Sequence, residues 1–322
     1  MDYSALIIDV VRSREYLNYD LASNSNKRQE IQDFLTYCIK FLNNNFSNTI
    51  ESCLTFSGGD EIQGLFSDPG SAYLCFRLLT MLVHPVKIRG GIGIGTWNIK
   101  TNEITSASQD GIAYFNARQS ITDAKKSKTS LLVYCDHDYE KTRPINATID
   151  ISIQICTQRS EIQNGVALLG EMFLPLFWKN RSSSYCQENA YSFDPNTSGS
   201  SYENTCINVL KKKDSYNSRI MGKKEEENPI SFIKDYSKLS DLSQTIRKYE
   251  SKMGGRNLPQ YYIDEGVIPG FSYDLENVLG KTRQGLEKTI KNAQITIERN
   301  LALSILELFT LGFDAPRWQS WY

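Results

Sequence analysis

The chain has 322 residues, a length that suits two domains or one large domain with an appendage. Its content of 40% hydrophobic and 23% charged residues is typical of a globular protein with a buried core, and its net charge of −1 excludes a global attraction to nucleic acid or anionic membranes. Seven cysteines without a C-x-x-C pair favour packed, reduced thiols over disulfides or a zinc site. The sequence begins without a signal peptide and has no apolar stretch of bilayer-spanning length, so we expect a cytoplasmic protein without membrane contact.

The first 135 residues alternate between strand-like and helix-like patterns. Short β-branched or apolar runs predict strands at 3–11, 51–57, 61–67, 86–97 and 130–135. Apolar residues at helical spacing predict helices at about 27–46, 67–83 and 110–126. This order is β-α-β-β-α-β with additions, so it predicts an α+β fold of the ferredoxin-like kind.

The composition changes after about residue 145. A helical stretch is followed by a segment rich in Ser, Asn and Tyr at 181–205, and helical periodicity returns in the last hundred residues. We therefore expect three units: an α+β domain at 1–145, a helix and flexible connector at 146–230, and a separate helical C-terminal domain at 231–322.

The segment "TFSGGDEIQGLF" (55–66) places two acids, Asp60 and Glu61, directly after a glycine pair and between β-prone runs. In a ferredoxin-like sheet the first strand lies beside this hairpin, so Asp9, near the end of that strand, is expected to face Asp60. A buried unpaired carboxylate is costly, whereas two acids that share a divalent ion are compensated. Carboxylate oxygens favour Mg²⁺ or Mn²⁺, and two such ions can activate a ribose hydroxyl and stabilise leaving pyrophosphate. The alternative is that these acids only end a strand and cap an exposed turn.

Two glycine motifs accompany the acids. Gly58 and Gly59 have no Cβ, which suits their N–H groups to contact phosphate. Gly91 and Gly93 alternate along "VKIRGGIGIG" (86–95), so one face of that strand is bare and would admit a flat ligand, such as a nucleotide base, or a partner backbone. The alternative is a strand that packs closely against a helix.

Four motifs resemble the SatD family in order and spacing: "SALIIDVVRSRE", "FSGGDEIQGLF", "VKIRGGIGIG" and "DGIAYFNARQSI". The first three also resemble the core motifs of class III nucleotidyl cyclases and of GGDEF-type palm domains. The resemblance implies that Asp9 and Asp60 hold two Mg²⁺ or Mn²⁺ ions, with Glu61 as an auxiliary ligand or base. Main-chain carbonyls near Ile8 and Val10 would complete the metal shell.

The same resemblance implies nucleotide contacts. Asn116 and Arg118 are similar to the Asn and Arg that orient ribose and stabilise the transition-state phosphate in class III cyclases, although their spacing here is Asn-x-Arg rather than Asn-x-x-x-Arg. Lys125 is placed to reach phosphate oxygens, but basic residues at a helix end are often only solvated. Phe56 stands where adenylate cyclases carry a base-reading lysine, which argues against a standard adenylate cyclase and leaves the substrate base open.

The stretch 273–300 resembles a helix-turn-helix, a segment with which SatD-like proteins often end. Gly280 would turn the chain, and Thr282 would cap a second, basic helix. One hypothesis places that helix in a DNA major groove with Arg283 and Gln284 near base edges. The alternative is a helical hairpin that packs on the first domain or forms a dimer, and the overall charge favours this second hypothesis.

These observations predict a metal-dependent nucleotidyl cyclase-like enzyme that converts an NTP to a cyclic mono- or oligonucleotide signal with release of pyrophosphate, in bacterial stress or antiphage signalling. A cyclase of the class III kind would act as a homodimer with its site at the interface. The alternative is a non-catalytic nucleotide-sensing or DNA-binding transcriptional regulator of the SatD type. Retention of both acids favours the enzyme, whereas a basic, exposed second C-terminal helix would favour the regulator.

Overall fold

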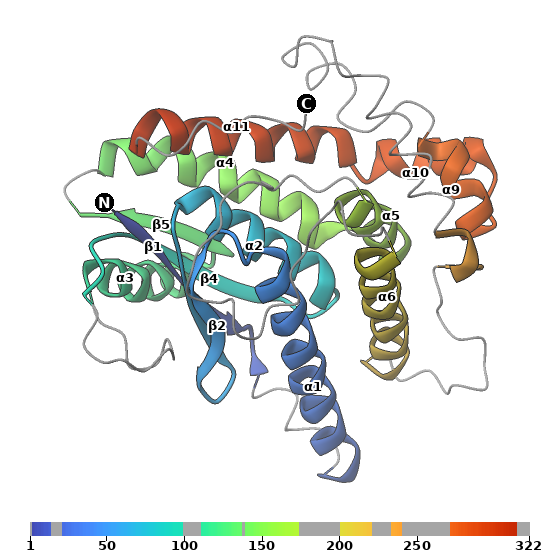
Figure 1. Cartoon of the computed structure of the whole chain (residues 1–322), viewed down its shortest axis with the longest axis horizontal. Coiled ribbons are helices and arrows are strands. Elements are labelled where there is room, and N and C mark those ends of the chain that lie inside the picture. The colour runs from blue at the N-terminus through green and yellow to red at the C-terminus, as the bar shows by residue number, and fades with distance from the viewer. Residues whose placement is uncertain are drawn as a thin grey trace.

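The computed structural model describes residues 2–13, 21–98, 111–136, 139–173, 200–220, 233–239 and 271–313 (Figure 1). The strands are β1 (Tyr3–Val10), β2 (Ile50–Gly58), β3 (Glu61–Phe66), β4 (Ile88–Gly95) and β5 (Leu131–Cys135). The helices of the first half are α1 (Leu21–Asn45), α2 (Pro69–Val83), α3 (Ile112–Ser127), α4 (Tyr139–Gln158) and α5 (Glu161–Phe173). The later helices are α6 (Ser200–Ile220), the short η3 (Tyr236–Lys238), α9 (Phe271–Leu279), α10 (Arg283–Asn292) and α11 (Ile295–Phe313).

The five strands form one sheet in the order β2-β3-β1-β4-β5. The central strand β1 is antiparallel to both neighbours, with Ile8 opposite Ile62 of β3 and Gly90 of β4. The fifth strand is parallel to β4 and adds to its outer edge. The first four strands thus have the ferredoxin-like order, which confirms the predicted α+β pattern.

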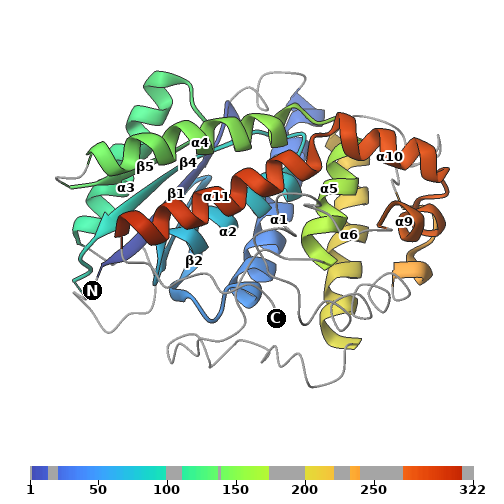
Figure 2. The ribbon, with the colours of Figure 1, turned by 90° about the horizontal axis from the view of Figure 1, so that it is seen from above.

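The two faces of the sheet are covered by different helices. Because successive strand residues point to opposite faces, Leu6, Ile8 and Val10 of β1 join the main core with α1 and α2. Ala5 and Ile7 point the other way and pack with α3 in a smaller cluster. Figures 1 and 2 show α3 on one side of the sheet. On the other side α4 packs against both β5 and α2, and α11 lies beside α4.

All fifteen residues of α2 are buried. Asp68 caps this helix by accepting a hydrogen bond from the Ser71 backbone N–H at 2.8 Å, and Pro69 occupies its first turn. A helix that is apolar on every side needs neighbours on every side. Here the sheet contacts one side of α2, and α4, α5 and α11 contact the others.

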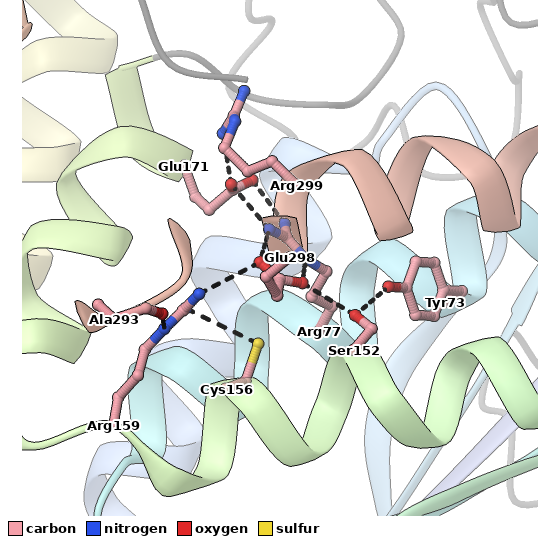
Figure 3. Close-up of polar contacts among 9 residues, drawn as sticks. All are labelled: Tyr73, Arg77, Ser152, Cys156, Arg159, Glu171, Ala293, Glu298 and Arg299. Atoms are coloured by element: carbon pink, nitrogen blue, oxygen red, sulfur yellow. Dashed lines mark hydrogen bonds and ion pairs between the residues drawn. The ribbon is translucent and has the colours of Figure 1, made fainter. Parts of the chain in front are cut away.

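A buried ionic cluster joins α2 to the C-terminal part of the chain (Figure 3). Arg77 of α2 donates hydrogen bonds to Glu298 of α11 at 2.6 and 2.5 Å and to Glu171 of α5 at 2.9 Å. Glu171 also accepts a short hydrogen bond from Arg299, and Ser152 of α4 donates to Glu298 at 2.9 Å. Helices from both halves of the sequence therefore share one set of charges, which we call the Arg77 cluster.

The predicted division into units differs from this packing. The boundary at residue 145 falls inside the continuous helix α4, and the boundary at 230 lies outside the described residues. The main core is one connected set that runs from Leu6 in β1 to Phe309 in α11. Residues 271–313 thus pack on the α+β domain, which corresponds to the alternative in which the C-terminal helices cover the first domain.

Two expectations from composition can be compared with the described residues. None of the helices in these ranges is both long and apolar enough to cross a membrane. The six cysteines within the ranges are free thiols, and Cys186, the seventh, lies outside them. The described cysteines agree with the prediction of packed thiols.

Candidate functional site

The β2–β3 hairpin turns through Gly59 and Asp60, with Gly58 paired to Glu61 at the strand ends. Gly59 has a φ of +63°, whereas Asp60 does not have a positive φ, which is the pattern of a type II′ turn. A Cβ built on Gly58 or Gly59 would meet no other described atom within 4 Å. The backbone of this glycine pair is therefore open to a ligand.

A hollow of about 310 Å³, part of it open to solvent, lies between this hairpin, the end of β1 and α1. It is lined by Val10, Ser13, Arg28, Ile31, Gln32, Leu35, Phe56 and Asp60. Its surface is almost entirely apolar, with the ring of Phe56 and the aliphatic side chains among its lining, and the other four lining residues are polar.

Asp60 brings an unsatisfied charge to the hollow. Its Oδ2 atom is buried and has no hydrogen-bond partner among the described residues. Gln32 fixes the neighbouring turn to α1, since its Nε2 donates to the Gly59 carbonyl at 3.4 Å. A buried carboxylate oxygen without a partner is costly, and a divalent cation would satisfy it.

The other two acids of the predicted site lie on the α3 side of the sheet. Asp9 Oδ2 forms an ion pair with Lys125 Nζ at 2.7 Å. Glu61 accepts from Arg118 Nη1 at 2.8 and 3.0 Å and from Ser57 Oγ at 2.7 Å. Two of the predicted site residues of α3, Arg118 and Lys125, therefore contact the predicted acids, but as counter-charges.

Asp9 and Asp60 have different surroundings in the structure. Asp9 shares the face of Ile7 and contacts α3, whereas Asp60 lines the hollow on the α1 side with Val10. The described ranges contain no group of three His, Cys, Asp or Glu side chains arranged to hold a metal. Ile8 lies within the sheet with a partner strand on each side, which leaves Val10 as the β1 residue beside Asp60.

These residues fit a cation that is coordinated partly by the protein and partly by the phosphate groups of a bound molecule. Asp60 offers one unpartnered carboxylate oxygen, and the open glycine pair leaves room for phosphate oxygens next to it. Mg²⁺ is commonly bound in this way, through one or two carboxylates together with substrate phosphates. The fit is therefore to a metal–nucleotide complex rather than to an all-protein metal cage.

The glycine-rich strand has a packing role, and the expectation of an open face is wrong. A Cβ on Gly91 would lie 2.5 Å from the Ala117 carbonyl oxygen, and a Cβ on Gly93 would lie 2.1 Å from that of Ala113. Helix α3 thus presses its backbone against β4, which is the alternative reading of this motif. Asn116 is part of the same contact: it is fully buried, and its Nδ2 donates to the Ile94 carbonyl at 2.8 Å.

Sequence reasoning missed the contribution of α1 to the site. Arg28, Ile31, Gln32 and Leu35 all line the hollow, and their spacing of i, i+3, i+4 and i+7 places them on one face of the helix. Ile31 and Leu35 belong to the apolar pattern that predicts a helix at 27–46. Arg28 and Gln32 lie on the same face of that helix, and polar side chains on an otherwise apolar face are the signal that could have indicated the site.

Comparison with known proteins adds a family. The sequence model of the SatD family matches residues 3–171, from β1 into α5. No curated protein matches the chain significantly.

Among solved structures, the crystal structure of a class III adenylyl cyclase-like ATP-binding protein from Pseudomonas aeruginosa is similar at 12% sequence identity and a TM-score of 0.28. The alignment covers 98% of this chain, which spans 60% of that protein. A TM-score this low does not support a shared fold. The family match, in contrast, extends over more than half of the 322 residues and includes all five strands, so the chain belongs to the SatD family.

Proposed function

We propose that the chain binds a nucleoside triphosphate with a divalent cation in the hollow beside the β2–β3 hairpin and acts on it as a nucleotidyl cyclase-like enzyme. The observation that carries this proposal is the buried, unpartnered Oδ2 of Asp60. It lies in a hollow between the hairpin, the end of β1 and α1, next to a glycine pair whose backbone is open. A carboxylate in this position needs a cation, and phosphate groups need close backbone approach.

The residues divide into a metal–phosphate end and a base end. Asp60, with the main chain near Val10, would hold Mg²⁺ or Mn²⁺. The N–H group of Gly59 would contact phosphate, and Gly58, whose own N–H faces Glu61 in the hairpin, would leave room beside it. The cation would activate the ribose hydroxyl and stabilise the charge on departing pyrophosphate. Phe56 offers an aromatic face on which any base can stack.

The α3 side chains would enter from the neighbouring face. The side chains of Arg118 and Lys125 are 56% and 46% exposed, so both can turn from their present acids toward a triphosphate. Lys125 would then leave Asp9 free as a second carboxylate, and Arg118 would leave Glu61 free as an auxiliary base. In the reaction the ribose oxygen bonds to the α-phosphorus, the bond from that phosphorus to the pyrophosphate oxygen breaks, and the hydroxyl proton passes to a base.

Product analysis tests the enzyme directly. The full chain is incubated with each of the four NTPs and Mn²⁺, and products are identified by mass. We expect a cyclic nucleotide and pyrophosphate from the wild type, and at least about a hundredfold lower rate from Asp60→Asn, which keeps the shape but removes a charge. Asp33→Asn, an exposed acid of α1, is the matched control and should leave the rate unchanged. Absence of product from every NTP would reject the catalytic part of the proposal.

One observation favours the DNA-binding regulator as a second candidate. Helix α10 follows α9 after a turn at Gly280, whose φ is +61°, and Thr282 caps it. Leu286 is the buried residue of α10, whereas its basic side chains are exposed: Arg283, Lys288 and Lys291. A basic, exposed second helix is the feature expected of a DNA-reading helix.

Salt-dependent DNA binding tests this second candidate. Fluorescence anisotropy with a labelled duplex should show an affinity that falls steeply as the salt concentration rises. In the double variant Lys288→Ala and Lys291→Ala, the slope of log affinity against log salt concentration should be smaller by about 2, the change expected for two lost phosphate contacts. The variant Lys211→Ala and Lys212→Ala on α6 is the control with the same loss of charge. Equal effects of both variants, or no binding at low salt, would reject a specific role for α10.

A further inference from the structure

Three polar side chains line the hollow without a part in the proposed chemistry: Ser13, Arg28 and Gln32. Arg28 and Gln32 lie one helical turn apart on α1, so they project from the same side of the helix. They line the hollow together with Phe56, the aromatic residue at its base end. An aromatic face combined with hydrogen-bonding side chains is the usual way in which proteins bind an unpaired base.

Arg28 is a half-buried cation without a partner in the described part of the chain. No hydrogen bond or ion pair joins it to another described residue, although Asp60 lines the same hollow. The basic residues of α3 differ in this respect, since Arg118 and Lys125 each pair with an acid. The N–H donors of Arg28 are therefore not committed to another described residue.

Gln32 is only partly available. Its Nε2 is directed to the Gly59 carbonyl at 3.4 Å, which leaves its side-chain oxygen as an acceptor. A glutamine recognises adenine by directing its amide nitrogen and its oxygen together at the base edge, whereas this hydrogen bond turns the nitrogen of Gln32 toward the hairpin and leaves one of its two N–H groups uncommitted. Arg28 has no such tether.

We propose that Arg28 is the specificity-determining residue of this site and that it selects a guanine base. This inference rests on the proposed nucleotide binding. Arginine presents two parallel donors in a rigid fork, and guanine is the base that presents two adjacent acceptors, O6 and N7. Adenine places a donor next to its N7 acceptor, and the corresponding edges of cytosine and uracil carry a single polar group. Arg28 would hold the guanine edge while Phe56 packs on the ring.

Nucleotide binding to the full chain tests the assignment. Calorimetry in Mn²⁺ is done with 2′,3′-dideoxy nucleotides, which lack the hydroxyl groups needed for reaction. We expect dideoxy-GTP to bind at least about tenfold more tightly than the ATP, CTP and UTP analogues. The 7-deaza form of dideoxy-GTP, which has C–H in place of N7, should lose about tenfold in affinity because one of the two hydrogen bonds is gone.

Variants of Arg28 complete the test. Arg28→Ala should remove both the preference for dideoxy-GTP and the effect of the 7-deaza substitution. Arg28→Lys should do the same, because it keeps the charge but not the fork of N–H donors. Lys27→Ala, the adjacent cation outside the hollow, should keep the preference for guanine. An equal loss of affinity for all four nucleotides in Arg28→Ala would place Arg28 on the phosphates and overturn the inference, as would a wild type without base preference. Those results leave nucleotide binding intact, whereas failure of all four analogues to bind would overturn the proposed function as well.

Discussion

Arg77 and Glu298 are 221 residues apart in the sequence and form a bidentate ion pair in the interior, with N–O distances of 2.6 and 2.5 Å (Figure 3). Both side chains are almost completely buried, at 2% and 1% exposure. The pair connects α2, which packs against the sheet, to α11, the last described helix. It therefore makes the C-terminal helices part of the core that supports the proposed nucleotide site.

Removing one partner of this pair should destabilise the whole protein. In Glu298→Gln the guanidinium of Arg77 loses a carboxylate while it remains buried, so we expect a loss of about 3–5 kcal/mol in the free energy of unfolding. Glu287→Gln on α10 breaks an exposed ion pair with Arg283 and should cost less than about 1 kcal/mol. Urea denaturation of the three proteins measures both values, and equal midpoints would contradict a structural role for the cluster.

The same carboxylate predicts a pH dependence of stability. Burial raises the pKa of Glu298, but the charge and hydrogen bonds of Arg77, together with Arg159 and Ser152, outweigh burial and lower it from 4.5 to about 2. Because the pKa in the folded state is the lower one, the stabilisation is complete above about pH 4.5 and is lost as the pH falls toward 2. Urea denaturation between pH 6 and pH 3 should show this loss in the wild type, and Glu298→Gln should show a clearly shallower dependence. Parallel curves would mean that other carboxyl groups cause the acid effect.

The first 145 residues should not fold by themselves. Ending the chain there cuts α4 and removes α5 and α11, which exposes one side of α2 and leaves Arg77 without either carboxylate. Circular dichroism of that fragment should show no cooperative melting, whereas the full chain should melt in one transition because its core is continuous. A sharp transition in the fragment would show that the α+β domain is independent after all.

Local sequence patterns predicted the elements well. Asp68 and Pro69 indicate the start of α2, and the glycine pair indicates the hairpin, because helix capping and turn formation depend on residues that are neighbours in the sequence. The apolar composition of α2 on every side is a further local signal, because it indicates a helix that must be covered by other elements on both sides. The partnership of Arg77 with Glu298 had no local signal, because it depends on packing between distant segments.

The site was predicted less completely, for a geometric reason. The sequence placed Asp9 and Asp60 at neighbouring strand ends, but strand alternation and hairpin register decide the face to which each side chain points. A shift of the pairing register by one residue moves a side chain to the other face of the sheet, and the residue composition does not specify this register. The same holds for Gly91: its sequence pattern predicts a bare strand face, but whether a ligand or α3 covers that face depends on tertiary packing.

Lys125 should matter for nucleotide affinity more than for stability. Its ion pair with Asp9 is about half exposed, so Lys125→Met should change the free energy of unfolding by less than about 1 kcal/mol. Calorimetry should nevertheless show weaker binding of a dideoxy nucleotide, because the cation is proposed to move to the phosphates. Lys126→Met is the matched control, since this neighbour pairs with Asp123 on the surface of α3. Indistinguishable affinities of the two variants would leave Lys125 as a counter-charge only.

The most direct test of the account is the effect of Mn²⁺ on nucleotide affinity in the wild type and in Asp60→Asn. If Asp60 holds the cation of a metal–nucleotide complex, Mn²⁺ should raise the affinity of the wild type for its preferred dideoxy nucleotide by at least about tenfold, and this gain should disappear in Asp60→Asn. Without metal, the variant should melt at the same or a higher temperature, because its buried unpartnered charge is gone. An equal gain from Mn²⁺ in both proteins, or no nucleotide binding by the wild type, would contradict the account.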